Sequence, residues 1–129
     1  MSSDNQPLMD INVLKQLVAD TSLEMLPRML EIFCQELKER ERKLKGVLNE
    51  DDVVNIAKEV HATKSCAGTF GAAALYQSSL ALEQKARSGD FSAEELQGSI
   101  QSLIDLTVLT QSHFVKFDID RELATNDSL

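Results

Sequence analysis

The chain has 129 residues, which support one domain with a real core and are too few for two. Its net charge of −8 makes nucleic acid and anionic membranes unsuitable partners, because an acidic surface repels phosphates. It has only five glycines and two prolines, which favours an all-α fold over a sheet protein with its many turns.

The first predicted elements are a short helix and a long one. Residues 1–9 are predicted to form a flexible tail, and Asp10 can cap a short amphipathic helix that begins at Ile11. A second start signal over 20–22 precedes the long helix, with Pro27 in its early turns, where the missing N–H costs least. The apolar stripe of this long helix comprises Leu23, Leu26, Leu30, Phe33, Leu37, Leu44, Val47 and Leu48.

Residues 49–52 interrupt the apolar stripe of the long helix, and three further helices are predicted after them. The third helix has its buried stripe at Val53, Ile56, Val60, Thr63 and Ala67. It is expected to end in a tight reversal over 68–71. The fourth helix stops at 88–90, and Ser92 caps the last one, which runs to about 117.

These elements predict the architecture. Four long helices with short links should pack as an antiparallel up-down-up-down four-helix bundle, with the short N-terminal helix across one end. We expect a single domain over residues 10–117, with tails at 1–9 and 118–129. The stripes bury enough aliphatic surface for ordinary stability.

The third helix carries the pattern most informative about function. Lys64, Ser65 and Gly68 follow His61 at offsets of three, four and seven residues, so all four share one helix face. Ala57 continues this face one turn earlier. An imidazole beside a cation, among neighbours of little bulk, suits an anion held on His61 while a second protein presses close. Ala57, Ser65 and Gly68 are therefore the expected partner-binding residues.

Glu83 on the fourth helix is the expected neighbour of His61. The chain rises roughly 12 Å from His61 to Thr69 and returns roughly 16 Å from Ala72 to Glu83. A carboxylate at that level can accept the Nδ1–H of the imidazole and leave Nε2 outward as a nucleophile. Pairing with a nearby lysine is the other role open to Glu83, and Gln84 is the alternative neighbour of the histidine.

The combination predicts a phosphoryl group held on His61, with Lys64 contacting a phosphoryl oxygen. The chain has no glycine-rich nucleotide loop and no cluster of Mg²⁺ carboxylates near His61. It is therefore expected to have no kinase activity of its own and no cofactor, with Mg²⁺ supplied by a partner. No Cys/His cluster has zinc spacing, so no metal site is predicted.

At this point the sequence resembles a known family. His61, Lys64, Gly68, Phe70 and Gly71 resemble the HxxKxxxGxFG signature of histidine-containing phosphotransfer (HPt) domains. The resemblance covers the predicted helices from about 22 to 117. The run over 61–67 looks most like stand-alone quorum-sensing phosphorelay proteins. The run over 67–71 is also similar to the phosphotransfer domain of chemotaxis kinases, in which a glutamate at the Glu83 position orients the histidine.

The resemblance implies a phosphohistidine at His61. It implies that the phosphoryl group comes from an aspartate of one receiver domain, in a hybrid sensor kinase, and passes to the aspartate of another, in a response regulator. Most members have glycine directly after the lysine, whereas this chain has Ser65. A serine is still small enough for docking, and it can narrow the set of receivers that fit.

Other expectations concern the partner surface and the cell compartment. A phosphorylation-independent adaptor that docks a receiver is the alternative function. Met25, Met29 and Ile32 are the apolar docking candidates on the preceding helix. The chain shows no secretory signal and no membrane-spanning run, and Cys34 and Cys66 suit reduced apolar packing, so a cytoplasmic monomer is predicted.

Overall fold

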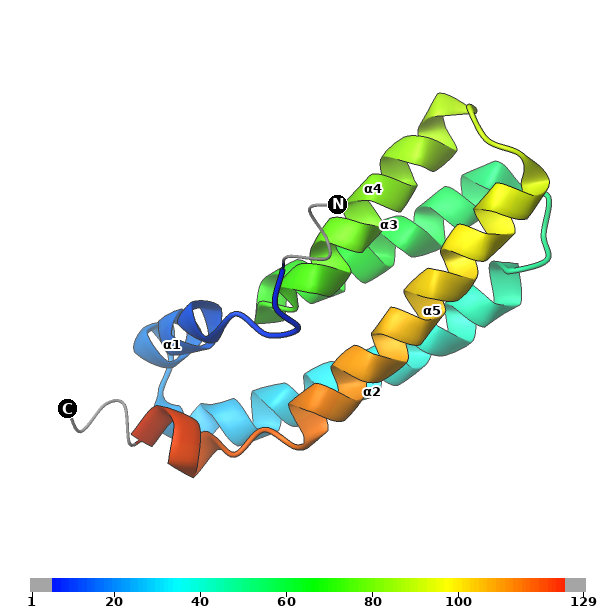
Figure 1. Ribbon diagram of the computed structural model, residues 1–129. Coiled ribbons are helices and arrows are strands. Elements are labelled where there is room, and N and C mark those ends of the chain that lie inside the picture. The colour runs from blue at the N-terminus through cyan, green and yellow to red at the C-terminus, as the bar shows by residue number, and fades with distance from the viewer. Residues whose placement is uncertain (1–5, 125–129) are drawn as a thin grey trace.

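The computed structural model describes residues 6–124, and these form an all-helical bundle without strands. The long helices are α2 (Leu26–Val47), α3 (Val53–Phe70), α4 (Ala73–Ser88) and α5 (Ala93–Val115). They run antiparallel to their neighbours, and the shorter α1 (Ile11–Asp20) lies at one end (Figure 1). A 3₁₀ turn, η2 (Leu23–Met25), leads into α2, and a π-helical segment, η3 (Asp120–Ala124), follows α5. The predicted architecture is confirmed.

The helices begin and end at residues whose chemistry explains the boundary. The side chains of Asp10, Asp52 and Ser92 accept backbone N–H groups in the first turns of α1, α3 and α5. Gly71 and Gly89 end α3 and α4 in the left-handed conformation, with φ of 76° and 72°. The predicted end of this helix within 68–71 is confirmed, since α3 continues to Phe70 and Gly71 is its C-cap.

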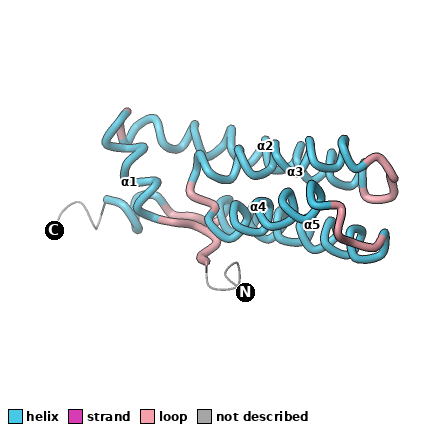
Figure 2. Tube along the Cα trace, turned by 90° about the horizontal axis from the view of Figure 1, so that it is seen from above, coloured by secondary structure: helices cyan, strands magenta, loops and turns pink. Residues whose placement is uncertain are grey.

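The core is formed by buried side chains of all the α-helices. Figure 2 shows the arrangement of these helices from above. Phe33 of α2 stacks on Phe70 of α3 with ring centroids 4.5 Å apart, and it meets Phe114 of α5 edge-on at 4.8 Å. The rest of the core is mainly aliphatic, so the helices are held by packing of the predicted stripes. This packing fixes the face that α3 turns outward.

Two segments expected as tails make contacts in the structure. The carbonyl of Pro7 accepts the N–H of Ala74 at 2.8 Å, and Met9 packs against the core. Leu123 of η3 is buried, and it lines a pocket with residues of α1. A few apolar residues in a polar stretch gave no periodic signal, which is why the sequence did not reveal these contacts. The outermost parts of the expected tails, 1–5 and 125–129, lie outside the described residues.

Candidate functional site

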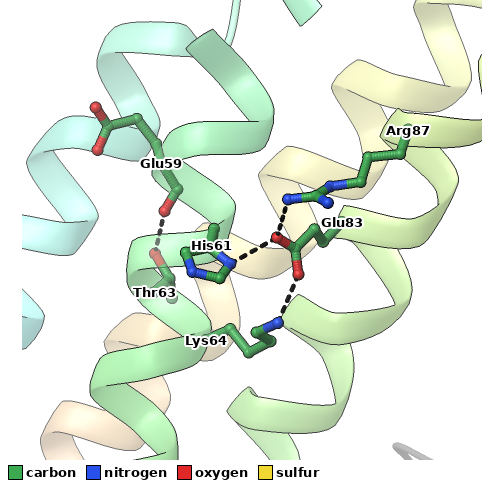
Figure 3. Close-up of polar contacts among 6 residues, drawn as sticks. All are labelled: Glu59, His61, Thr63, Lys64, Glu83 and Arg87. Atoms are coloured by element: carbon green, nitrogen blue, oxygen red, sulfur yellow. Dashed lines mark hydrogen bonds and ion pairs between the residues drawn. The ribbon is translucent and has the colours of Figure 1, made fainter. Parts of the chain in front are cut away.

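His61 projects from the middle of α3 at the boundary between its buried and exposed faces. The preceding residue, Val60, is fully buried, and one residue turns the helix by about 100°. The His61 side chain is consequently 53% exposed, and its ring is directed toward Glu83 of α4 (Figure 3). A second molecule can therefore approach the ring from solvent.

Glu83 of α4 fixes the orientation of this ring. Its Oε2 lies 2.7 Å from Nδ1 of His61, although the Glu83 side chain is only 6% exposed. The hydrogen bond from Lys64, followed by that from His61, holds the pKa of Glu83 below its usual value against the opposing effect of burial. An ionised carboxylate only accepts hydrogen bonds, so Nδ1 carries the proton and donates it. The neutral ring then keeps its lone pair on Nε2, which points away from Glu83 (Figure 3).

Two cations bind the same carboxylate. Lys64 Nζ donates to Oε1 of Glu83 at 2.7 Å, and Arg87 donates to Oε2 at 2.9 Å. Glu83 thus orients the histidine and pairs with the lysine, the two roles that the sequence left open. The Lys64 side chain is only 19% exposed. Its ammonium reaches from α3 to α4, because the buried carboxylate of Glu83 attracts it. Lys64 and His61 are the partners of Glu83 on α3.

The charges of this cluster do not cancel. One carboxylate, Glu83, lies against two cations, Lys64 and Arg87, and a neutral imidazole adds none. The site therefore carries a local surplus of one positive charge on a chain whose net charge is −8. Such a surplus favours an incoming anion at short range, where screening by salt is weakest.

The neighbours of His61 on α3 are small, as expected. Ser65 and Gly68 are exposed and Ala57 is half-buried, so none of them obstructs approach to the ring. Gly68 also has a packing reason to be glycine, because a Cβ there would lie 3.2 Å from the ring of Tyr76. The alternative neighbour, Gln84, is exposed and has no contact with His61.

The apolar docking candidates on η2 and α2 lie away from the level of His61. Arg40 bonds Glu59 of α3 at 3.1 Å and so marks that level on α2. Ile32 is exposed but lies about 12 Å further along the helix, and Met25 lies more than about 20 Å away. Met29 packs against the core. Met25 and Met29 are thus poorly placed for contact near the imidazole.

The sequence reasoning missed two residues. Arg87 was given no role, although its offset of four residues from Glu83 on one helix could have indicated the ion pair. Val54 was not considered at all, although it shares a helix face with His61 and is 80% exposed. Phe70, which belongs to the family signature, stacks on Phe33 in the core about 13 Å along α3 from His61.

Searches for other features gave negative results within residues 6–124. No group of three or more His, Cys, Asp or Glu side chains in this range is arranged to hold a metal ion. Over the same residues, no helix combines the length and apolar character needed to cross a bilayer. Cys34 and Cys66 are both free thiols.

Comparisons with known proteins agree with the geometry. The family model described as the Hpt domain matches residues 28–111. Phosphorelay protein LuxU of Vibrio vulnificus strain YJ016 is 28% identical over 110 residues, which are 85% of this chain and 94% of that protein. LuxU of strain CMCP6 matches equally well. The crystal structure of histidine-containing phosphotransfer protein B from Pseudomonas aeruginosa PAO1 has a similar fold, with a TM-score of 0.66 at 24% identity, covering 87% of this chain and 98% of that one.

Proposed function

The chain belongs to the Hpt domain family, and from this premise we propose that it carries a phosphoryl group on His61 in a two-component phosphorelay. The donor is an aspartyl-phosphate of a receiver domain in a hybrid sensor kinase. The acceptor is the aspartate of a second receiver domain, in a response regulator. The observation that supports this role best is the 2.7 Å contact of Nδ1 with Glu83, because it leaves Nε2 free and exposed.

The transfer step needs only groups that this chain and a receiver supply. The Nε2 lone pair of His61 attacks phosphorus, the P–N bond forms, and the P–O bond to the donor aspartate breaks, which releases a carboxylate. The proton on Nδ1 stays in place and the ring gains positive charge. Glu83 faces that charge and stabilises it. In the second step the acceptor aspartate attacks phosphorus, and His61 leaves as the neutral imidazole.

Lys64 and Arg87 provide the charge that the phosphoryl group requires. Before transfer they exceed Glu83 by one positive charge, and the phosphohistidine, with two negative charges on its phosphoryl group and one positive charge on its ring, cancels that surplus. We propose that Lys64 turns from Oε1 of Glu83 to a phosphoryl oxygen, a shift of one flexible side chain. Ala57, Ser65 and Gly68 form the surface against which the receiver lies.

The proposed role is that of a phosphocarrier and not of a kinase. Mg²⁺ comes with the receiver domain, where it supports the transfer from the other side of the phosphoryl group. One imidazole per chain is sufficient, so the chain acts as a monomer, and its partners place it in the cytoplasm.

The test is labelling of the protein by a receiver domain that has been phosphorylated with radioactive acetyl phosphate. The wild-type chain should acquire label that is labile in acid and stable in alkali, as a P–N bond is. His61→Gln should abolish the label and leave the helical circular dichroism unchanged. Label that persists in His61→Gln points to another acceptor, and a wild type that binds receivers but never acquires label is an adaptor.

A further inference from the structure

One outward strip of α3 runs past His61 on both sides. Val54, His61 and Gly68 follow at intervals of seven residues, which is close to two full turns, so they share a face. Successive members are about 10 Å apart along the axis. Lys58 and Ser65 lie on the same exposed strip. We refer to these five residues as the α3 strip.

Val54 is the large apolar member of the α3 strip. It is 80% exposed, more than any other large hydrophobic side chain among residues 6–124. The other exposed large hydrophobic residues lie on η2, α2 and α5: Met25, Ile32, Val108, Leu109 and Val115. A β-branched residue lowers helix propensity, and Val54 gains no burial in return, so the fold itself does not account for it.

The proposed function requires a partner over this strip. An aspartate of the receiver must come into line with Nε2 of His61, so the contact area is centred close to that ring. A protein interface of ordinary size covers about 800 Å² on each partner, or roughly 30 Å across. The distance of about 10 Å from His61 to Val54 lies well inside that radius.

We propose that Val54 is a docking residue of the receiver domain, which covers it with an apolar side chain of its own. The inference rests on the proposed function and adds a residue that sets affinity for the partner. Val54 takes no part in the chemistry, since it lies about 10 Å from the reacting nitrogen. Its effect is confined to binding of the phosphorylated or unphosphorylated receiver.

Val54 offers a cleaner test of docking than Gly68, the opposite end of the α3 strip. A side chain at Gly68 would press on Tyr76 at 3.2 Å and disturb the α3–α4 packing. Val54 is the second residue of α3, after the N-cap Asp52. An aspartate there suits the positive end of the helix dipole, so Val54→Asp should fold at least as well as the wild type.

The experiment measures transfer from a phosphorylated receiver domain that labels the wild-type chain, over a range of receiver concentrations. Val54→Asp should raise the receiver concentration for half-maximal rate by about tenfold or more, as loss of an interface contact does, and leave the maximal rate unchanged. The uncharged variant Val54→Ser should show the same change to a smaller extent.

Two controls separate docking from other effects. Val115→Asp adds the same charge at a residue that is 64% exposed at the far end of α5, and it should transfer like the wild type. Labelling by phosphoramidate, whose P–N bond breaks to release ammonia, needs no receiver and should be equal in all four proteins.

The possible results are distinct. Transfer by Val54→Asp with wild-type concentration dependence overturns the docking role and leaves the phosphocarrier role intact. An equal loss in Val54→Asp and Val115→Asp assigns the effect to net charge and also overturns it. A wild type that no phosphorylated receiver and no phosphoramidate can label refutes the proposed function, and the docking role with it.

Discussion

The two sides of α3 each hold a polar cluster, and they differ in their balance of acids and cations. On the α4 side, one carboxylate, Glu83, accepts from Lys64, Arg87 and His61. This side has an excess of positive charge and an exposed ring nitrogen. It is arranged to receive an anion.

The cluster on the α2 side has the opposite balance. Arg40 bonds Glu59 at 3.1 Å, and the thiol of Cys66 donates to Glu36 at 3.2 Å, so the cluster contains two carboxylates and one cation. Burial raises the pKa of Cys66 to about 12, and the thiol therefore remains a neutral donor at ordinary pH. The contrast shows that similar numbers of polar groups on the two sides of one helix can leave opposite local balances of charge.

The strongest test of this contrast removes one carboxylate from each side. Glu83→Gln keeps the shape but loses the charge that orients His61 and faces the developing positive ring. Its labelling by phosphoramidate should slow by about 10²-fold, the size expected for a misplaced or unsupported reacting group. Glu59→Gln, the matched change on the α2 side, should label at the wild-type rate. Equal rates in all three proteins would remove Glu83 from the mechanism.

Removal of one cation from each side should have opposite consequences. Lys64→Ala should slow transfer about tenfold through loss of a phosphoryl contact, and it should change stability little because Glu83 keeps Arg87 and His61. Arg40→Ala should transfer normally but lower the free energy of unfolding by about 2 kcal/mol, since Glu59 is left largely buried without a partner. Urea denaturation and transfer kinetics measure the two effects. A transfer defect in Arg40→Ala would contradict the division between the sides.

The smallest expected effect is a dependence of stability on acid pH. The pKa of Glu83 lies below its ordinary value of 4.5, chiefly because of the hydrogen bond from Lys64. The ionised group therefore stabilises the fold fully above the ordinary value, and this contribution is lost as pH falls through the lower, folded-state pKa. Glu83→Gln should reduce the slope of stability against pH in that acid range, and Lys64→Ala should do so in part. If both variants keep the wild-type slope, the acid sensitivity of the fold is due to groups other than Glu83.

The bundle was predictable from the sequence because its signals are local and periodic. Apolar stripes gave the buried faces, and Asp10, the stretch 49–52 and Ser92 gave the starts of three helices. Leu123 was not predictable in this way, since a single leucine in a polar stretch has no period, and its burial depends on the distant α1.

The candidate site was predictable to the extent that helix rise sets its geometry. Counting the rise along two antiparallel helices brought Glu83 to the level of His61, and the structure has that contact. The same counting treats each side chain alone, so it did not decide whether Lys64 pairs with Glu83, and it omitted Arg87. Which partner a flexible cation selects depends on where buried charge lies, and the helical pattern of the sequence does not contain that information.

Gly71 has a consequence that reaches beyond this chain. Its φ of 76° suits glycine alone, and a Cβ there would also lie 2.8 Å from Val13 of α1. The N-terminal helix α1 therefore packs against the backbone at position 71, where only a residue without a side chain fits. In related proteins, any other residue at this position should accompany a differently seated or missing first helix, so one amino acid can serve as a marker for that variation.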